Sequence, residues 1–159
     1  MDAIYGDTHI PLGKYFAYFT KQYIGHFTNQ LEDLPIDRYF YPLYLIGKNN
    51  GSIHQKELCA LLHADKVTVN RIIEYLVKHE MIEKKVDKAD RRRYNLHLKP
   101  GISGYIERIE KAILETDKFI VDRAANKKLF IENVIHLYKE LQEQQFEDIS
   151  LTFKRVKNK

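Results

Sequence analysis

Apolar residues along much of the chain recur at steps of three and four, the spacing that places them on one face of an amphipathic helix. Long helices of this kind are predicted over residues 12–32, 102–125 and 128–149. The apolar face of the first helix consists of Leu12, Phe16, Phe19, Tyr23, Phe27 and Leu31. Aromatic faces at this spacing usually pack in a core or in a dimer interface.

A further helix is predicted over residues 38–47. Pro35 interrupts the first helical pattern, and Asp37 is expected to cap the new helix with its carboxylate. Pro42 falls in the early turns of this helix, where a proline is less damaging than in the middle. The polar residues 47–52 then form a loop by composition.

Two short helices occupy the middle of the chain. Ser52 is followed three residues later by Gln55, which is typical of a capping box that opens a helix over residues 54–63. After a tight connection, Asp65 is expected to cap a second helix over residues 66–79. Two short helices joined by a minimal turn favour a helix–turn–helix motif.

Strand-like residues follow this helix pair. The runs 81–86 and 93–98 predict a hairpin whose long polar tip is residues 87–92. The fold class is therefore expected to be mainly α with a small β-hairpin wing, a winged helix–turn–helix core flanked by long N- and C-terminal helices. The expected parts are N-terminal helices, a winged helix–turn–helix lobe and C-terminal helices, at residues 1–47, 48–99 and 100–159.

Composition narrows the class of protein. Of 159 residues, 44% are apolar, with seven Gly and four Pro, which favours a compact, helix-rich chain. No apolar run reaches a membrane span, and the polar N-terminus shows no secretory signal, so a cytoplasmic protein is expected. Phosphate-binding glycine loops, nucleophile elbows and metal-ligand spacings are missing from the sequence, so neither an enzyme nor a cofactor is expected.

The distribution of charged residues along the chain indicates the kind of partner that the protein binds. The chain carries +4 overall, while residues 54–99 hold eleven Lys or Arg against seven Asp or Glu, so the rest of the chain is balanced. A basic excess confined to the short helices and the hairpin is expected where a protein faces a polyanion. Double-stranded DNA is the predicted partner.

The second short helix has two chemically distinct faces. Its apolar spacing predicts a buried face of Val69, Ile72, Ile73 and Leu76. The candidate DNA contacts near its start are Lys66, Val67, Thr68, Asn70 and Arg71. Arginine can hold guanine, asparagine can hold adenine, and a valine methyl group can touch the thymine methyl. A solvated helix face is the simpler alternative, because Lys, Asn and Thr are ordinary there.

The segment QKELCALLHADKVTVNRIIEYLVKHEMIEKKVDKADRRRYNLHL resembles the winged helix–turn–helix core of MarR-type transcriptional regulators. Its most specific part is DKADRRR, which has the Asp-x-x-Asp-Arg-Arg pattern of that family's wing tip. The resemblance implies a homodimer in which residues 48–99 are the DNA-binding lobe and the N- and C-terminal helices are dimerisation helices that interlock. Its two recognition helices would enter successive major grooves of a pseudo-palindromic operator, most often to repress transcription.

The resemblance also assigns roles to the residues of the wing. It implies that Arg92 enters the minor groove and that Asp90 orients it, while Arg91 and Lys88 lie near phosphates. A narrow minor groove concentrates negative potential, which agrees with an inserted arginine. Arg93 is expected only to start the returning strand.

The chain departs from the family pattern at three places. His63 stands where the family often has a glycine in the helix–turn–helix turn, and Glu80 where a glycine commonly precedes the first wing strand. The usual Leu-Thr-x-x-Gly after the second strand appears as LKPGISG. These differences concern local turn geometry more than the fold.

Aromatic residues of the first two helices suggest a ligand site. The resemblance implies a pocket for small ligands between the dimerisation helices and the DNA-binding lobe, and the candidates to line it are Tyr15, Phe19, Tyr39 and Tyr44. Tyrosine and phenylalanine suit a planar aromatic or apolar effector. Core packing or a dimer interface is the alternative interpretation.

Other residue types give weaker signals. Cys59 is expected to pack as a small apolar residue beneath the recognition helix, with a redox switch or an enzymatic thiol as the alternatives. No His-x-x-x-His pair or Cys–His cluster predicts a metal site, although His26 and His136 would be the candidates if their helices met. A winged-helix adaptor that binds protein instead of DNA is the main rival function.

Overall fold

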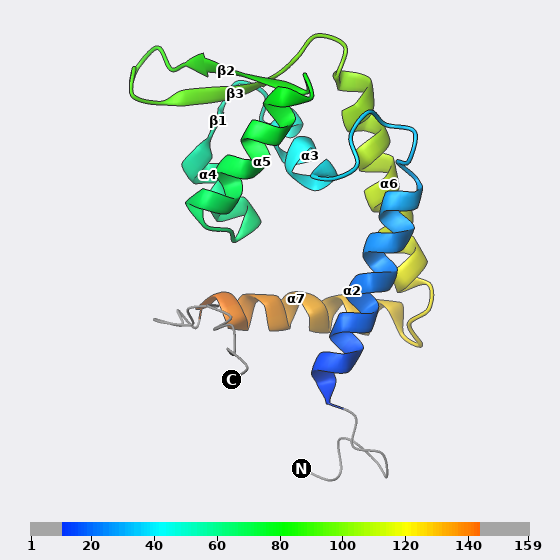
Figure 1. Ribbon diagram of the computed structural model, residues 1–159. Helices are drawn as coiled ribbons and strands as arrows, with labels where there is room; N and C mark the ends of the chain where they lie inside the picture. Colours follow the sequence, from blue (N-terminus) through cyan, green and yellow to red (C-terminus); the bar gives the residue numbers. More distant parts are fainter. Residues whose placement is uncertain (1–10, 144–159) are drawn as a thin grey trace, which may run out of the picture. The chain divides into compact units, whose positions relative to one another are not determined.

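The computed structural model describes residues 11–143. This part contains six helices and one three-stranded antiparallel sheet (Figure 1), which confirms the predicted mainly α fold with a small wing. The chain divides into two compact units, residues 1–118 and 119–159. Among the described residues, no helix is both long and apolar enough to cross a membrane.

The first two helices begin and end somewhat differently from the prediction. Helix α2 spans Leu12–Asn29, and α3 spans Phe40–Lys48. The predicted cap at Asp37 is wrong: the N-cap of α3 is Tyr39, and Asp37 instead binds groups on another helix. Pro42 does lie in the first turn of α3, as expected.

Helices α4 (Gln55–Leu62) and α5 (Lys66–Lys78) form the helix–turn–helix. The predicted cap of α5 is confirmed, because the Asp65 carboxylate accepts hydrogen bonds from the amide of Thr68 at 2.8 Å and from its hydroxyl at 2.7 Å. The predicted Ser52 cap of α4 is wrong. His54 is the N-cap, and its amide donates to the Glu57 carboxylate at 2.7 Å.

The sheet explains why α4 starts later than the Ser52 pattern suggested. Strand β1 (Ile53–His54) pairs with β3 (Tyr94–Leu98), and β3 pairs with β2 (Ile82–Val86), so the strand order is β1-β3-β2. The residues just after Ser52 are extended to join β3, and the chain becomes helical only beyond them. The predicted hairpin is confirmed, whereas the two-residue strand β1 was not predicted.

Both helix–turn–helix helices end in a left-handed residue that is not glycine. His63 has φ 48° and Glu80 has φ 60°. Beyond α5, the amide of Met81 donates to the Leu76 carbonyl at 2.9 Å and that of Glu80 to Val77 at 3.1 Å, the hydrogen bonds of a Schellman motif. The two positions where the sequence lacks the family's glycine therefore both have the left-handed conformation that glycine adopts most readily.

A continuous apolar core lies between the helices and the sheet of the first unit. It takes residues from α2, α3, α4, α5, α6 and all three strands, including the fully buried Leu31, Leu43, Ile46, Leu58, Val69, Ile73, Leu76, Ile82, Leu96 and Ile109. Helix α2 contributes only from its C-terminal end. Its earlier apolar residues Leu12, Phe16 and Phe19 are 51%, 55% and 53% exposed, so half of the predicted stripe lies outside the core.

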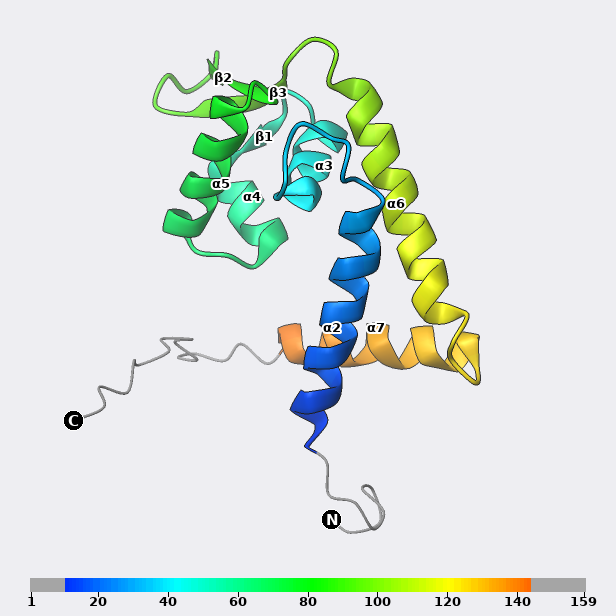
Figure 2. The ribbon, with the colours of Figure 1, turned by 45° about the vertical axis from the view of Figure 1, so that its right-hand side comes forward.

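Helix α6 (Ser103–Val121) lies beside α2 in both views (Figure 1, Figure 2), and polar side chains join the two helices. Thr116 is fully buried, and its hydroxyl lies 3.0 Å from both the His26 ring and the Gln30 amide. The Tyr23 hydroxyl donates to Asp117 at 2.7 Å, and burial, together with that carboxylate, raises the pKa of Tyr23.

The second unit contains helix α7 (Lys127–Glu143). The predicted continuation to residue 149 lies outside the described residues. Helix α7 buries none of its apolar side chains within the described chain, and those exposed are Leu129, Phe130, Ile131, Val134, Ile135, Leu137, Tyr138 and Leu141.

Gly47 allows α3 to approach α6 closely. A Cβ atom at this position would lie 2.7 Å from the Ile106 side chain, which is buried. We expect Gly47→Ala to lower the free energy of unfolding by about 1–3 kcal/mol, because the added methyl group overpacks the core. Gly25→Ala is the control: apart from its own helix backbone, nothing lies within 4 Å of a Cβ added there, so removing a helical glycine should raise stability by about 0.5–1 kcal/mol. Equal stability of the two variants in chemical denaturation would contradict this account.

Candidate nucleic-acid interface

Helix α5 directs its polar side outward, as predicted. Its apolar face is buried, with exposed fractions of 0–6% at Val69, Ile72, Ile73 and Leu76. Near its start, Val67 is 63% exposed, and Lys66, Thr68 and Arg71 are also exposed. These predicted contact residues are therefore accessible to a partner as large as a DNA duplex, and Asn70 beside them is half-buried.

The start of α5 is anchored by its cap. Because Thr68 donates both its amide and its hydroxyl to Asp65, these hydrogen bonds lower the pKa of the Asp65 carboxyl. The Thr68 hydroxyl is thus engaged with the cap, although the residue is exposed. This leaves Val67, Asn70 and Arg71 as the side chains best suited to contact bases.

Asp87 holds the turn of the wing, a role that the sequence analysis did not identify. Its carboxylate accepts hydrogen bonds from the amides of Ala89 at 2.7 Å and Asp90 at 2.8 Å, and from the Asn95 side chain at 2.9 Å. The two backbone amides are the largest cause of a lowered pKa at Asp87. An Asp whose carboxylate bonds to amides two and three residues later is a known turn signal, so the sequence did contain a clue.

Asp90 acts differently from the expectation. Its carboxylate accepts a hydrogen bond from the backbone amide of Arg92 at 3.0 Å, but its ion pair, at 3.1 Å, is with the side chain of Arg93. Asp90 therefore fixes the backbone at Arg92 without holding its guanidinium group. Arg93, expected only to start the strand, is the arginine that is paired.

The remaining cations of the wing are accessible. Lys88, Arg91 and Arg92 are exposed, and within residues 11–143 their side chains form no hydrogen bond or ion pair. Unpaired cations held on a fixed turn can neutralise phosphates without first breaking an ion pair. The wing therefore has the charge and the accessibility that contact with a polyanion requires.

A groove joins the wing to α5. This cavity of about 260 Å³ has an apolar floor of Ile73 and Leu96, and Asn70 from α5 borders it. Its other lining residues include the cations Lys56, Lys84, Arg92 and Arg93. The two elements predicted to contact DNA thus border one cationic concavity.

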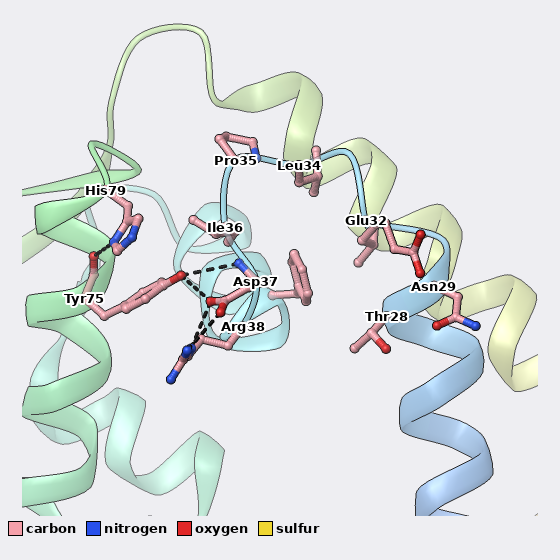
Figure 3. Close-up of a pocket in the computed structure, with 12 residues that line it drawn as sticks. Thr28, Asn29, Glu32, Leu34, Pro35, Ile36, Asp37, Arg38, Tyr75 and His79 are labelled. Atoms are coloured by element: carbon pink, nitrogen blue, oxygen red, sulfur yellow. Dashed lines mark hydrogen bonds and ion pairs between the residues drawn. The ribbon is translucent and has the colours of Figure 1, made fainter.

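A cluster of polar side chains links Tyr75 of α5 to the segment before α3 (Figure 3). The Tyr75 hydroxyl donates to the Asp37 carboxylate at 2.6 Å and accepts from the Asp37 amide at 3.3 Å. Arg38 binds the same carboxylate through two nitrogens at 2.8 and 2.9 Å, and this guanidinium is the main reason why the pKa of Asp37 is far below its usual range. The rings of Tyr39 and His79 pack on Tyr75.

This cluster lines a cavity of about 640 Å³. Its apolar wall includes Leu31, Leu34, Ile36 and Phe40, and its polar side includes Tyr75 and His79. Tyr39 lines a neighbouring cavity of about 530 Å³ and has φ 63°, a left-handed conformation that is strained for an aromatic residue.

The four aromatic candidates for an effector pocket lie in different surroundings. Tyr39 borders the 530 Å³ cavity just described, whereas Tyr15 and Phe19 are exposed on α2. The Tyr44 hydroxyl donates to Glu110, and its ring lies beneath the Lys48 ammonium. Sequence reasoning missed Tyr75, Asp37 and Arg38, because only the folded chain brings these residues together.

Other candidates from the sequence have structural surroundings. Cys59 is half-buried and packs against the apolar core, as expected. His26 contacts Thr116 and Gln30, and His136 lies 3.8 Å from Glu140 on its own helix. No group of three or more potential metal ligands occurs among residues 11–143.

Comparison with known proteins gives a consistent result. Residues 36–93 match the MarR family. A Thauera aromatica protein whose name assigns it to transcriptional regulation of the hcr operon is 27% identical over 78 residues, which are 49% of this chain and 47% of that protein. The chain thus spans about half the length of this curated relative.

Solved structures extend the similarity over most of the chain. A crystal structure of MarR is 26% identical, with a TM-score of 0.69 over 87% of this chain and 95% of that one. The S. aureus MepR–DNA complex is 17% identical, with a TM-score of 0.72 over 85% of this chain and 99% of that one. The resemblance to MarR-type regulators that the sequence predicted is therefore confirmed.

Proposed function

We propose that this chain, whose winged helix–turn–helix is of the MarR type, is a transcriptional regulator that binds double-stranded DNA as a homodimer. Helix α5 would enter the major groove, with Arg71 on guanine and Asn70 on adenine. The wing would place Arg92 at the adjacent minor groove, while Lys88 and Arg91 neutralise phosphates. Repression of a pseudo-palindromic operator in the cytoplasm is the mode of action that we infer.

The joint position of α5 and the wing is the observation that carries this proposal. Asn70 and Arg92 line one groove although they are distant in sequence, and the groove is rimmed by cations. An adaptor that binds protein has no need of unpaired arginines on a fixed turn. The MepR–DNA complex, whose fold this chain shares, also supports DNA as the partner.

The homodimer is proposed from exposed apolar surface. Helix α2 leaves Leu12, Phe16 and Phe19 exposed, and α7 exposes a long row of aliphatic and aromatic residues. Contiguous apolar surface of this kind usually marks an interface. A second copy is the natural partner, since the resemblance to MarR-type proteins implies that the terminal helices interlock.

Ligand response is proposed from the cavity beside Tyr75. A volume of about 640 Å³ falls within the range of small-molecule sites, and the lining combines an apolar wall with polar and charged side chains, which suits a small aromatic ligand that also carries polar groups. Asp37 is the connection, because it lines the cavity and binds Tyr75 on α5. A ligand that displaces Asp37 would break its hydrogen bond with Tyr75 of the recognition helix. Loss of this contact would shift the equilibrium between two dimer geometries.

Replacement of the wing arginine tests DNA binding. We expect Arg92→Ala to weaken binding to operator duplex and to lower the slope of log K against log salt by about one, because one cationic contact is lost. Lys111→Ala removes an equal charge from an exposed site on α6 and should change neither quantity. Fluorescence anisotropy over a salt series measures both. If the two variants behave alike, the wing assignment fails, and if the wild type binds no duplex, the adaptor is favoured.

Replacement of an exposed phenylalanine tests the homodimer. Phe16→Asp should weaken dimerisation by at least about tenfold, because a carboxylate would be buried in an apolar interface. Leu61→Asp changes a similarly exposed apolar residue on α4, outside the proposed interface, and should leave the dimer intact. Sedimentation equilibrium distinguishes the two, and a monomeric wild type would contradict the proposal.

Removal of one hydroxyl group tests the ligand response. A panel of small aromatic compounds is measured for binding by thermal shift and for release of operator DNA. We expect some of the compounds to bind and to weaken DNA binding of the wild type. In Tyr75→Phe the same compounds should still bind but should change DNA affinity much less, because the link from Asp37 to α5 is lost. A panel without effect on the wild type, or equal release from both proteins, would refute this mechanism.

A further inference from the structure

Asn70 of the recognition helix is held by a neighbour on the same helix. Its side-chain amide donates to the Glu74 carboxylate at 2.7 Å, one turn further along α5. Arg71 and Lys78 are also within one turn of Glu74, yet neither forms an ion pair with it in the part of the chain that the structure describes. Glu74 thus binds the neutral amide of Asn70, although a cation lies nearby on either side.

The chemistry of this hydrogen bond determines which way the amide faces. A carboxylate only accepts, so the nitrogen of the amide must face Glu74 and its oxygen must face away. An asparagine that recognises adenine uses its oxygen and one N–H together, as acceptor and donor. The amide nitrogen carries two hydrogens, so one can bind Glu74 while the other remains beside the oxygen.

Glu74 also acts through its charge. It is exposed, as is Arg71 one turn before it on the outer side of α5. A negative charge on that side repels the phosphate backbone and weakens binding to any DNA sequence. An acidic residue at this position therefore does not raise the affinity for DNA. Glu74 can instead favour specificity, because its charge weakens non-specific binding while its hydrogen bond fixes the amide of Asn70 that reads a base.

We propose that Glu74 is a positioning residue for base recognition: it holds the Asn70 amide in the orientation that selects adenine, and its charge lowers non-specific affinity. This inference rests on the proposed DNA-binding function. The orientation is set before DNA is met, so less side-chain freedom is lost on binding. Glu74 acts through Asn70 and need not touch a base.

The test compares wild type, Glu74→Ala, Glu74→Gln and Asn70→Ala in selection of bound duplexes from a random pool, with full-length protein. Asn70→Ala identifies the adenine position in each half-site. Glu74→Ala should reduce the adenine preference there by about fivefold or more, since an unrestrained amide no longer pairs bidentately. Glu74→Gln, whose side-chain oxygen still accepts the hydrogen bond, should keep that preference.

Affinity for a random-sequence duplex gives the second readout. Both Glu74 variants should bind it about two- to threefold more tightly than wild type, because each removes the same negative charge. This change does not depend on the hydrogen bond, so it separates the two effects of Glu74.

Four results would overturn the inference or its premise. A wild type that selects no sequence refutes the proposed function itself. An unchanged adenine preference in Glu74→Ala refutes the positioning role while leaving DNA binding intact. Equal loss in Glu74→Gln assigns the effect to charge, and a change confined to a neighbouring cytosine shows that Glu74 contacts a base directly.

Discussion

Burial of one face of α5 is the constraint on which the rest of the structure depends. Val69, Ile72, Ile73 and Leu76 pack into the core, and each contributes about 1.5–3 kcal/mol when fully removed from water. Because the helix has only 3.6 residues per turn, fixing these four side chains also fixes which residues face outward. The accessible row of Val67, Asn70 and Arg71 is thus a consequence of core packing.

The tip of the wing, beyond the strands that pack into the core, is held by polar contacts instead. Asp87 binds two backbone amides and Asn95, and Asp90 binds the amide of Arg92, so two carboxylates define the turn from within. With acidic groups occupied in this way, Arg91 and Arg92 keep their charge for an external partner. Some charged residues of the tip therefore hold the turn, and others present cations to a partner. Arg93 belongs to those that hold the turn.

Much of this organisation could be predicted from the order of residues. The apolar spacing in α5, the Asp65 cap and the strand-like runs of the hairpin are local patterns, and all three were found where expected. The family resemblance rested on the wing tip and was confirmed by comparison with known proteins. Errors arose at Ser52 and Asp37, where residues suited to cap a helix were used differently because β1 pairs with β3 and because Tyr75 lies nearby.

The sequence by itself determined the helix–turn–helix, the hairpin and the concentration of positive charge in residues 54–99, because each depends on neighbours within a few positions along the chain. Only the tertiary structure decided that Arg93, not Arg92, pairs with Asp90, that Tyr75 contacts Asp37, and that Asn70 shares a groove with Arg92. Side-chain pairing depends on distance and direction in space, and residues with the same chemistry compete for one partner. Periodicity reveals which side of a helix is apolar, but packing decides which polar groups meet.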